Sequence, residues 1–317
     1  MQKLFLITPL LLALSFNTAA ASKFTVDGEV SAEVKHISDS LDDFNKTGYK
    51  LTRVVNFKYQ FDKNWEIYTR VAAQQANLKY DFYTEKDNGT TDSKVAIDHF
   101  GMVYKNAGIS YTLGQQSAII GQQGLIFDNT PYVGRELSAI KGLKVSGSVG
   151  KTELTAMYGQ MYATPALADE RLDITALSFT TAVAKNTKLG ASYAHSSQKN
   201  IGSMNNYALH AEQQIGKLQL MLEAMRSSAS TDNQAYAFSV AYQATDKDYF
   251  AVIANKSETN AAIAGFTPFE NDQKGFVYRY ERKLNEQAKL KFEFVDNRYI
   301  SQSGKYRVFT SALAYSF

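Results

Sequence analysis

The chain of 317 residues contains no cysteine and only four prolines. Without cysteine, neither a disulfide framework nor a thiolate metal site can form, so other forces must hold the fold together. The formal net charge is only +3, and no segment carries a dense cluster of lysine and arginine. This balance argues against a nucleic-acid partner.

Long hydrophobic runs are also missing, except near the N-terminus. There the apolar stretch from Leu4 to Phe16 follows the basic residue Lys3 and precedes three small residues at 19–21, which is the layout of a secretory signal peptide. About 13 apolar residues are too few for a membrane-spanning helix, which needs about 20. We therefore expect residues 1–21 to be a cleaved signal peptide and 22–317 to be the mature chain. The longest uncharged stretch, 106–127, is broken by Gln, Gly and Ser and does not predict a membrane helix.

Aromatic residues, in contrast, are plentiful, with 20 Tyr and 19 Phe. Apolar side chains recur at every second position in segments such as 24–34, 108–114, 217–225 and 289–295. Helical spacing does not produce this pattern, whereas strands with one apolar and one polar face do. The sequence therefore predicts an all-β protein.

Turn signals divide the mature chain into a regular series of strands whose connections alternate between short and long. Short turns on one rim and long polar loops on the other are typical of an outer-membrane β-barrel. A flat sheet would leave two unpaired edges, which lipid cannot satisfy, so the sheet must close. We predict sixteen antiparallel strands near 23–37, 48–61, 64–80, 94–105, 107–116, 140–149, 152–162, 171–184, 187–198, 204–215, 217–229, 232–244, 248–257, 272–283, 288–299 and 304–317.

The last residues, "FTSALAYSF", place Phe309, Leu313, Tyr315 and Phe317 on one parity. Terminal residues usually fray unless a sheet holds them, so this pattern predicts that the last strand pairs with the first. The alternating aromatic end resembles the C-terminal strand signal that outer-membrane proteins present to their insertion machinery. By this resemblance, Leu313, Tyr315 and Phe317 are the candidate assembly signal.

Over its whole mature length the chain resembles the general porins of Gram-negative bacteria. The strand "GISYTLGQQ" is similar to the family's G-x-L-x-L-G-R-Q strand, and the longest connection, 117–139, takes the place of the third long loop. The resemblance implies a homotrimer in the outer membrane, in contact with lipid and lipopolysaccharide, through which small hydrophilic solutes and ions diffuse passively without a cofactor. The family's P-E-F-G-G-D string is absent and Gln116 replaces the usual arginine, so selectivity does not carry over.

In the family this loop folds into the lumen and narrows the pore, with acidic residues facing basic ones on the wall. The candidate constriction residues are thus Asp128, Arg135 and Glu136 on the loop and Arg70 on the third strand. Alternation places acids and bases in nearly equal numbers on the inner face, which predicts weak ion selectivity. The clearest lining candidates are Glu29, Glu33, Lys50, Lys58 and Glu66.

Arg53 does not fit this alternation, because it shares the outward parity of Leu51 and Val55 and would face lipid near the outer rim. Two interpretations remain open. A β-bulge could turn the side chain inward, or the guanidinium could contact lipid phosphates.

Two other functions compete with a general porin. A barrel hydrolase would need a base held against a nucleophile, but His195 and its neighbour Ser196 point to opposite faces of one strand. A substrate-specific channel for a sugar or carboxylate would favour aromatic residues on the inner face, whereas most Tyr and Phe have the outward parity. The loop acids, including Asp42, Asp43, Asp87 and Asp92, are scattered, and we expect no metal site beyond weak Ca²⁺ binding.

Overall fold

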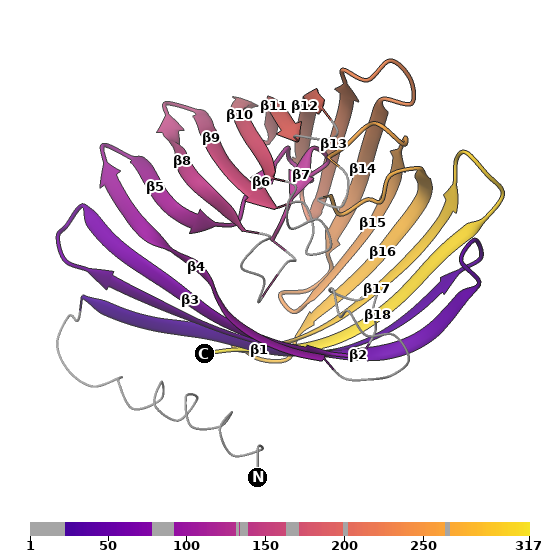
Figure 1. Cartoon of the computed structure of the whole chain (residues 1–317), viewed down its shortest axis with the longest axis horizontal. Helices are drawn as coiled ribbons and strands as arrows, with labels where there is room; N and C mark the ends of the chain where they lie inside the picture. The colour runs from indigo at the N-terminus through magenta and orange to yellow at the C-terminus, as the bar shows by residue number, and fades with distance from the viewer. Residues whose placement is uncertain are drawn as a thin grey trace, which may run out of the picture.

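The structure is a computed structural model that describes residues 23–77, 92–130, 133, 139–162, 171–198, 202–263 and 267–317. It is a closed barrel of sixteen antiparallel strands, as predicted (Figure 1). The barrel strands are β1 (Phe24–Asp39), β2 (Phe44–Gln60), β3 (Trp65–Ala76), β4 (Asp92–Asn106), β5 (Ile109–Gln116), β8 (Ile140–Val149), β9 (Thr152–Tyr162), β10 (Arg171–Ala184), β11 (Thr187–Gln198), β12 (Gly202–Ile215), β13 (Leu218–Ser227), β14 (Gln234–Gln243), β15 (Asp248–Ser257), β16 (Gln273–Lys283), β17 (Ala288–Tyr299) and β18 (Lys305–Ser316).

The barrel closes between β1 and β18, which pair over a long antiparallel ladder that includes Val30 opposite Tyr315. Phe317 extends this ladder, because its backbone N–H donates to Gly28 O at 3.0 Å and its own carbonyl accepts from Gly28 N at 3.0 Å. The prediction that the last strand pairs with the first is therefore confirmed. No edge is left in the sheet, and every barrel strand has a neighbour on each side.

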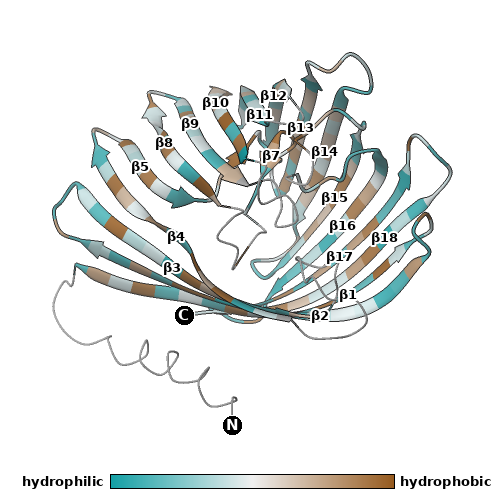
Figure 2. Ribbon diagram, in the orientation of Figure 1, coloured by the Kyte–Doolittle hydropathy of each residue, from teal (hydrophilic) through white to brown (hydrophobic). Residues whose placement is uncertain are grey.

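Hydrophobic and hydrophilic residues alternate along the strands of the barrel (Figure 2). The exposed large apolar side chains share one parity on each barrel strand except β4, and they lie on the outer face. Leu209 is 70% exposed and Tyr207 is 55% exposed, whereas Ala208 between them and Asn206 before them are buried. Aromatic rings contact one another on this face both at strand ends, as with Trp65 and Tyr104, whose ring centroids are 4.6 Å apart, and in mid-strand, as with Tyr278 and Phe294 at 6.2 Å. The outer surface is thus an apolar band rich in aromatic residues.

The two rims differ in the length of their connections. We call the rim with the turns 61–64, 107–108, 150–151, 185–186, 216–217, 244–247 and 284–287 the turn rim, and the opposite one the loop rim. At 107–108 both turn residues have positive φ, +47° at Ala107 and +80° at Gly108, which fits a two-residue type I′ hairpin. Within the described residues, no helix is both long and apolar enough to cross a membrane.

One predicted loop is largely strand. The first two predicted strands leave 38–47 as a connection, but β1 continues to Asp39 and β2 begins at Phe44, with only 40–43 between them. The ladder stays in register up to the Asp39–Phe44 pair, and His36 Nδ1 lies 2.8 Å from Thr47 Oγ1 across it. Polar side chains that pair across strands therefore extend this hairpin beyond the apolar band.

Candidate channel interior

The inner wall of the barrel has two halves of different chemistry. On β1–β5 and β16–β18 many inward side chains are polar, and the charged ones among them form local ion pairs. On β8–β15 the inward side chains are mostly small or apolar, and they belong to one buried cluster that includes Ile140, Met157, Ile174, Ala194, Ala208, Met225, Ala237 and Ile253. The sequence pattern indicated an evenly charged lining, and this division was not predicted.

The lining residues predicted from parity lie on the inner face and have partners there. Lys58 Nζ is 3.0 Å from Asp27 Oδ2, and Lys50 Nζ is 3.5 Å from Glu33 Oε1. The remaining two pairs join Lys289 to Glu29 at 3.7 Å and Lys105 to Glu66 at 3.5 Å. Most of these side chains keep part of their surface exposed, so each pair contributes little to stability. The charged half is accordingly a hydrated wall of nearly balanced charge.

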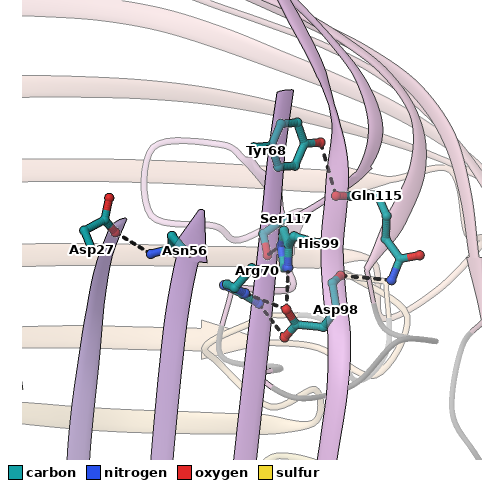
Figure 3. Close-up of polar contacts among 8 residues, drawn as sticks. All are labelled: Asp27, Asn56, Tyr68, Arg70, Asp98, His99, Gln115 and Ser117. Atoms are coloured by element: carbon teal, nitrogen blue, oxygen red, sulfur yellow. Dashed lines mark hydrogen bonds and ion pairs between the residues drawn. The ribbon is translucent and has the colours of Figure 1, made fainter. Parts of the chain in front are cut away.

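Arg70 lies on this wall and is held by a partner that sequence reasoning missed. Its guanidinium donates to both carboxylate oxygens of Asp98, at 2.6 and 2.8 Å (Figure 3). Asp98 Oδ1 is also 3.0 Å from His99 Nδ1, and His99 Nε2 is 2.7 Å from Ser117 Oγ. A chain of polar contacts thus runs from β3 through β4 to the start of the 117–139 segment.

A β-bulge in β4 makes this chain possible. Arg70 pairs with His99, whereas the next residue, Val71, pairs with Ile97, so Asp98 is the extra residue. Ile97 and Phe100 are 52% and 46% exposed on the outer face, and both residues between them turn inward. The run "IDHF", with two polar residues between outward apolar ones, was the available signal of this bulge.

The pairing changes the electrostatic role of Arg70. Asp98 is fully buried, and the Arg70 side chain is 18% exposed. A bidentate pair between a buried carboxylate and an arginine is geometrically specific and largely cancels the two charges. Arg70 is therefore one partner of a fixed ion pair on the wall and not a free positive charge.

Residues 117–130 lie against the inner face of the apolar half. The segment begins at Ser117, whose carbonyl accepts from Lys144 Nζ at 3.4 Å, and it contains a short hairpin of β6 (Ile119–Ile120) and β7 (Phe127–Asp128). We call residues 117–130 the inner hairpin. Its side chains Ile120, Leu125, Ile126 and Phe127 are buried in the apolar cluster of the wall. Burial of four large side chains against β8–β15 is a strong hydrophobic contribution, on the order of 1.5–3 kcal/mol each.

Two carboxylates of the wall hold the tip of the inner hairpin. Gln123 N–H donates to Glu223 Oε2 at 2.6 Å, and Gln122 Nε2 donates to Glu212 Oε2 at 2.9 Å. Gly121, at φ +95°, lies so close to the Glu223 carboxylate that a Cβ there would collide with it. Glu223 is fully buried by this arrangement. Glu223 has inward parity on its strand, opposite to that of the exposed Leu222, but no sequence signal identified its contact with a residue 100 positions away.

The tip of the inner hairpin lies on the opposite side of the barrel from Arg70, although the hairpin begins at Ser117 beside His99. From β3, which carries Arg70, the closed strand order passes β4, β5, β8, β9, β10, β11 and β12 before it reaches β13, which carries Glu223. That is half of the circumference. Asp128 lies on the hairpin, where its Oδ1 accepts from Thr130 N at 2.8 Å and from Thr130 Oγ1 at 2.6 Å. Arg135 and Glu136 lie outside the described residues.

The candidate assembly residues lie where β18 meets β1. Leu313 and Tyr315 are 48% and 44% exposed on the outer face. The Phe317 ring covers Gly28, and a Cβ at Gly28 would come within 2.5 Å of Phe317 Cζ. A glycine in β1 thus makes room for the terminal ring.

The bulge that sequence reasoning offered for Arg53 is wrong. Arg53 pairs with Val30 on one side and Ala73 on the other, and both ladders are in regular register through it. Its side chain consequently stays on the outer face. Because β2 begins at Phe44, four residues earlier than expected, Arg53 lies near the middle of the strand and not at its outer end. Contact with lipid phosphates remains a prediction.

The neighbours His195 and Ser196 point to opposite faces, as expected. His195 Nδ1 is 2.9 Å from Asn205 Oδ1, whereas Ser196 is buried on the inner side. This pair therefore does not form the nucleophile and base of a hydrolase. In the part of the chain that the structure describes, no three His, Asp or Glu side chains come together as a metal site.

Comparison with solved structures gives a consistent result. A mutant of the porin from Rhodopseudomonas blastica superimposes with a TM-score of 0.63, at 9% identity, over 93% of this chain and 100% of the porin. A second mutant of the same porin gives a TM-score of 0.62 at 10% identity over the same shares. The chain has the fold of a porin. No protein-family model matches the sequence, and no curated protein matches it either.

Proposed function

We propose that the protein is an outer-membrane porin of the general type, a water-filled channel for passive diffusion of small hydrophilic solutes and ions. One observation carries the proposal: a closed barrel that is apolar outside has an inner wall that is charged and partly exposed over half of its circumference. Such a surface binds water and gives no path for lipid. Because the sequence identity to the porins of similar fold is low, the proposal is based on the residues that line the barrel.

The channel runs along the charged half, beside the inner hairpin. The hairpin occupies the side of β8–β15, so the free cross-section lies between it and the walls of β1–β5 and β16–β18. We propose that 117–139 forms the constriction, with Asp128, Arg135 and Glu136 on the loop and the Arg70 pair on the opposite wall. Glu29, Glu33, Lys50, Lys58 and Glu66 line the approach from the charged side.

Ion selectivity in such a channel is weak. Acids and bases of the wall are paired locally, so no ring of a single sign is formed. A lining of one sign would favour one kind of ion. Paired charges instead keep water ordered across the lumen and favour polar solutes of either sign.

The remaining parts of the proposal concern the location and the partners. Residues 1–21 are the signal peptide, and the mature chain is a multi-pass barrel in the outer membrane of a Gram-negative bacterium. Leu313, Tyr315 and Phe317 are recognised by the insertion machinery, and three copies assemble into a homotrimer surrounded by lipid and lipopolysaccharide. The protein is not an enzyme, and it needs no cofactor.

Recording of the purified protein in planar bilayers tests the proposal. We expect stepwise conductance that is ohmic at low voltage, with a small reversal potential in a salt gradient. Deletion of 119–128 should raise the conductance, because it removes the obstruction while the barrel strands remain. Absence of any conductance from correctly folded barrel would contradict the channel, and unchanged conductance after the deletion would contradict the role of the hairpin.

A further inference from the structure

A second segment of the chain folds into the barrel beside the inner hairpin. It is the connection between β15 and β16, of which the structure describes residues 258–263 and 267–272. We call these two stretches the second inner loop. Four of its side chains are buried in the same apolar cluster that holds the hairpin; they are Ala261, Ala262, Ile263 and Phe269. The loop therefore lies against the inner wall of the barrel.

Hydrogen bonds from amide side chains hold both stretches of the loop in place. Asn206 is fully buried on β12, and its Nδ2 donates to the carbonyl oxygen of Ala261 at 2.7 Å. Asn271 Nδ2 donates to the carbonyl oxygens of Thr259 and Ala262, at 3.1 and 3.2 Å, and so joins the second stretch to the first. Because a buried amide is costly to leave without a partner, the bond from Asn206 favours the inward position of the loop.

The second inner loop contacts the inner hairpin next to Asp128. A Cβ at Gly124 of the hairpin would lie 3.0 Å from Asp128 Cβ and 3.4 Å from Pro268 Cδ. Pro268 and Asp128 thus flank the same glycine. The two segments consequently lie side by side, and the loop reaches the region that we propose as the constriction.

Glu270 lies between two anchored residues of this loop. Phe269 before it is 3% exposed in the apolar cluster, and Asn271 after it makes the hydrogen bonds described above. Glu270 itself is exposed to solvent, yet desolvation by the surrounding protein raises the pKa of its carboxyl group above the ordinary value. A side chain on the surface of a water-filled lumen has both properties, because it contacts water and still has protein on several sides.

Glu270 differs from the charged residues of the wall, because it has no partner in the part of the chain that the structure describes. Its carboxylate makes neither an ion pair nor a hydrogen bond there. Arg279, on the inner face of β16, is further toward the turn rim and is paired with Glu293 at 2.5 Å. The inner wall near the loop rim presents neutral amides that bond to one another; they belong to Asn255, Gln273 and Asn297.

We propose that Glu270 is a specificity-determining residue of the channel and that it favours cations over anions. Its negative charge attracts cations and repels anions that pass within one Debye length, which is about 8–10 Å at physiological salt. The paired charges of the wall largely cancel, so an unpaired carboxylate sets the sign of the remaining weak selectivity. The inference rests on the proposed channel function, and it adds to it a second inward loop and a residue that acts on the permeating ions.

The test uses the refolded mature protein in planar bilayers, with the reversal potential recorded in a potassium chloride gradient at low salt. Glu270→Gln should lower the ratio of cation to anion permeability by roughly twofold, the effect of one exposed charge about a Debye length from the ion in water. A heat-modifiable band on gels shows that each variant is folded.

The matched control is Glu258→Gln, which makes the same change of charge on the same loop. Glu258 Oε1 is 2.6 Å from Lys256 Nζ. Lys256 has the parity of the exposed Phe250 and Val252, so this pair lies on the outer side of the rim and away from the lumen. The permeability ratio of Glu258→Gln should therefore equal that of the native channel.

A chemical test locates the side chain independently. The chain has no cysteine, so Glu270→Cys introduces a single thiol. An anionic methanethiosulfonate reagent should restore the native permeability ratio, whereas a cationic reagent should lower the ratio below that of Glu270→Gln. Both adducts should reduce the conductance, because they occupy part of the lumen. The same reagents on Glu258→Cys should change neither quantity.

A conducting native channel whose permeability ratio is unchanged in Glu270→Gln would overturn the role of Glu270 and leave the channel standing. So would thiol adducts at position 270 that alter neither the ratio nor the conductance. An equal shift in Glu258→Gln would also overturn it, because the effect would then follow from net charge alone. A folded native barrel that does not conduct refutes the proposed channel, and the role of Glu270 with it.

Discussion

At the scale of single residues, Gly28 is a position where the fold leaves no room for a side chain. A side chain there would meet the terminal ring of Phe317 and the carbonyl oxygen of Val54. We expect Gly28→Ala to destabilise the barrel by about 1–3 kcal/mol, the usual cost of overpacking. The temperature at which the heat-modifiable band unfolds measures this cost.

A double-mutant cycle with Phe317→Ala isolates the contribution of the ring. In that background Gly28→Ala should cost less, because only the contact with the Val54 carbonyl remains. Ser31→Ala, on the inner face of the same strand, is the control and should have little effect. Equal costs of Gly28→Ala with and without the ring would show that the contact does not matter.

The Arg70–Asp98 pair is the second feature at this scale. Arg70→Gln leaves a fully buried carboxylate without its cation, which should cost about 3–5 kcal/mol and shift the reversal potential toward cations. Asp98→Asn leaves Arg70 unpaired and should shift it toward anions. Both shifts should shrink in high salt, because the Debye length falls from about 10 Å at 0.1 M to about 3 Å at 1 M.

The double variant Arg70→Gln/Asp98→Asn should restore the native reversal potential in the same recordings. Asp128→Asn removes an acid that faces Thr130 on the hairpin, and it should also shift selectivity toward anions if Asp128 is at the constriction. Identical reversal potentials for the native chain and the three single variants, Arg70→Gln, Asp98→Asn and Asp128→Asn, at low salt would remove both sites from the permeation path.

The face to which a side chain points was predicted correctly for some residues and not for others. Parity alone located Glu29, Glu33, Lys50, Lys58 and Glu66 on the inner face, because alternation on a strand is fixed by backbone geometry. It failed at Asp98 and His99, where a single inserted residue changes the alternation. It also could not choose between the two explanations of Arg53, since a bulge leaves only a faint trace in the sequence.

At the scale of elements, the inner hairpin is held by apolar burial along its length and by carboxylates at its tip. Glu223 accepts a backbone N–H of the hairpin, and glutamine in its place would keep one acceptor oxygen but lose the charge. A hydrogen bond to a charged group is worth about 1.5–3 kcal/mol. We therefore expect Glu223→Gln to loosen the tip and to increase the open-channel noise in single-channel recordings.

Glu212→Gln is the matched control. Glu212 accepts from the side-chain amides of Gln122 and Gln219, which can rotate to bond a new amide. The open-channel noise of the Glu212→Gln variant should remain close to that of the native channel. Equal noise in the native channel and both variants would mean that apolar burial alone fixes the hairpin.

The strands were predicted well from the sequence, but the hairpin that covers the inner face of half of them was not. Most predicted strand boundaries differ from the observed ones by no more than three residues, because turn residues and period-two patterns are local signals. These local patterns did not predict that one half of the inner wall is apolar. Ala194, Ala208 and Ala237 alternate with larger outward residues, and nothing in their own strands shows that a hairpin from 117–130 covers them.

At the scale of the whole molecule, the absence of cysteine and the absence of a sheet edge belong together. Stability comes from a ladder of backbone hydrogen bonds that returns to its own beginning. We expect a circular-dichroism spectrum dominated by β-structure, and slow migration on gels only after boiling. A reducing agent should leave both unchanged, and a mostly helical spectrum would contradict the fold.

Closure between β1 and β18 has a kinetic consequence. The hydrogen bonds between Gly28 and Phe317 join the first barrel strand to the residue that follows the last one, so they form only after nearly all of the barrel segment is available. Such distant contacts give a high contact order, which slows folding. Until that moment the growing sheet has two bare edges on which another chain could pair. The time spent in this open state, more than the stability of the finished barrel, would then set how much of the protein is lost to aggregation.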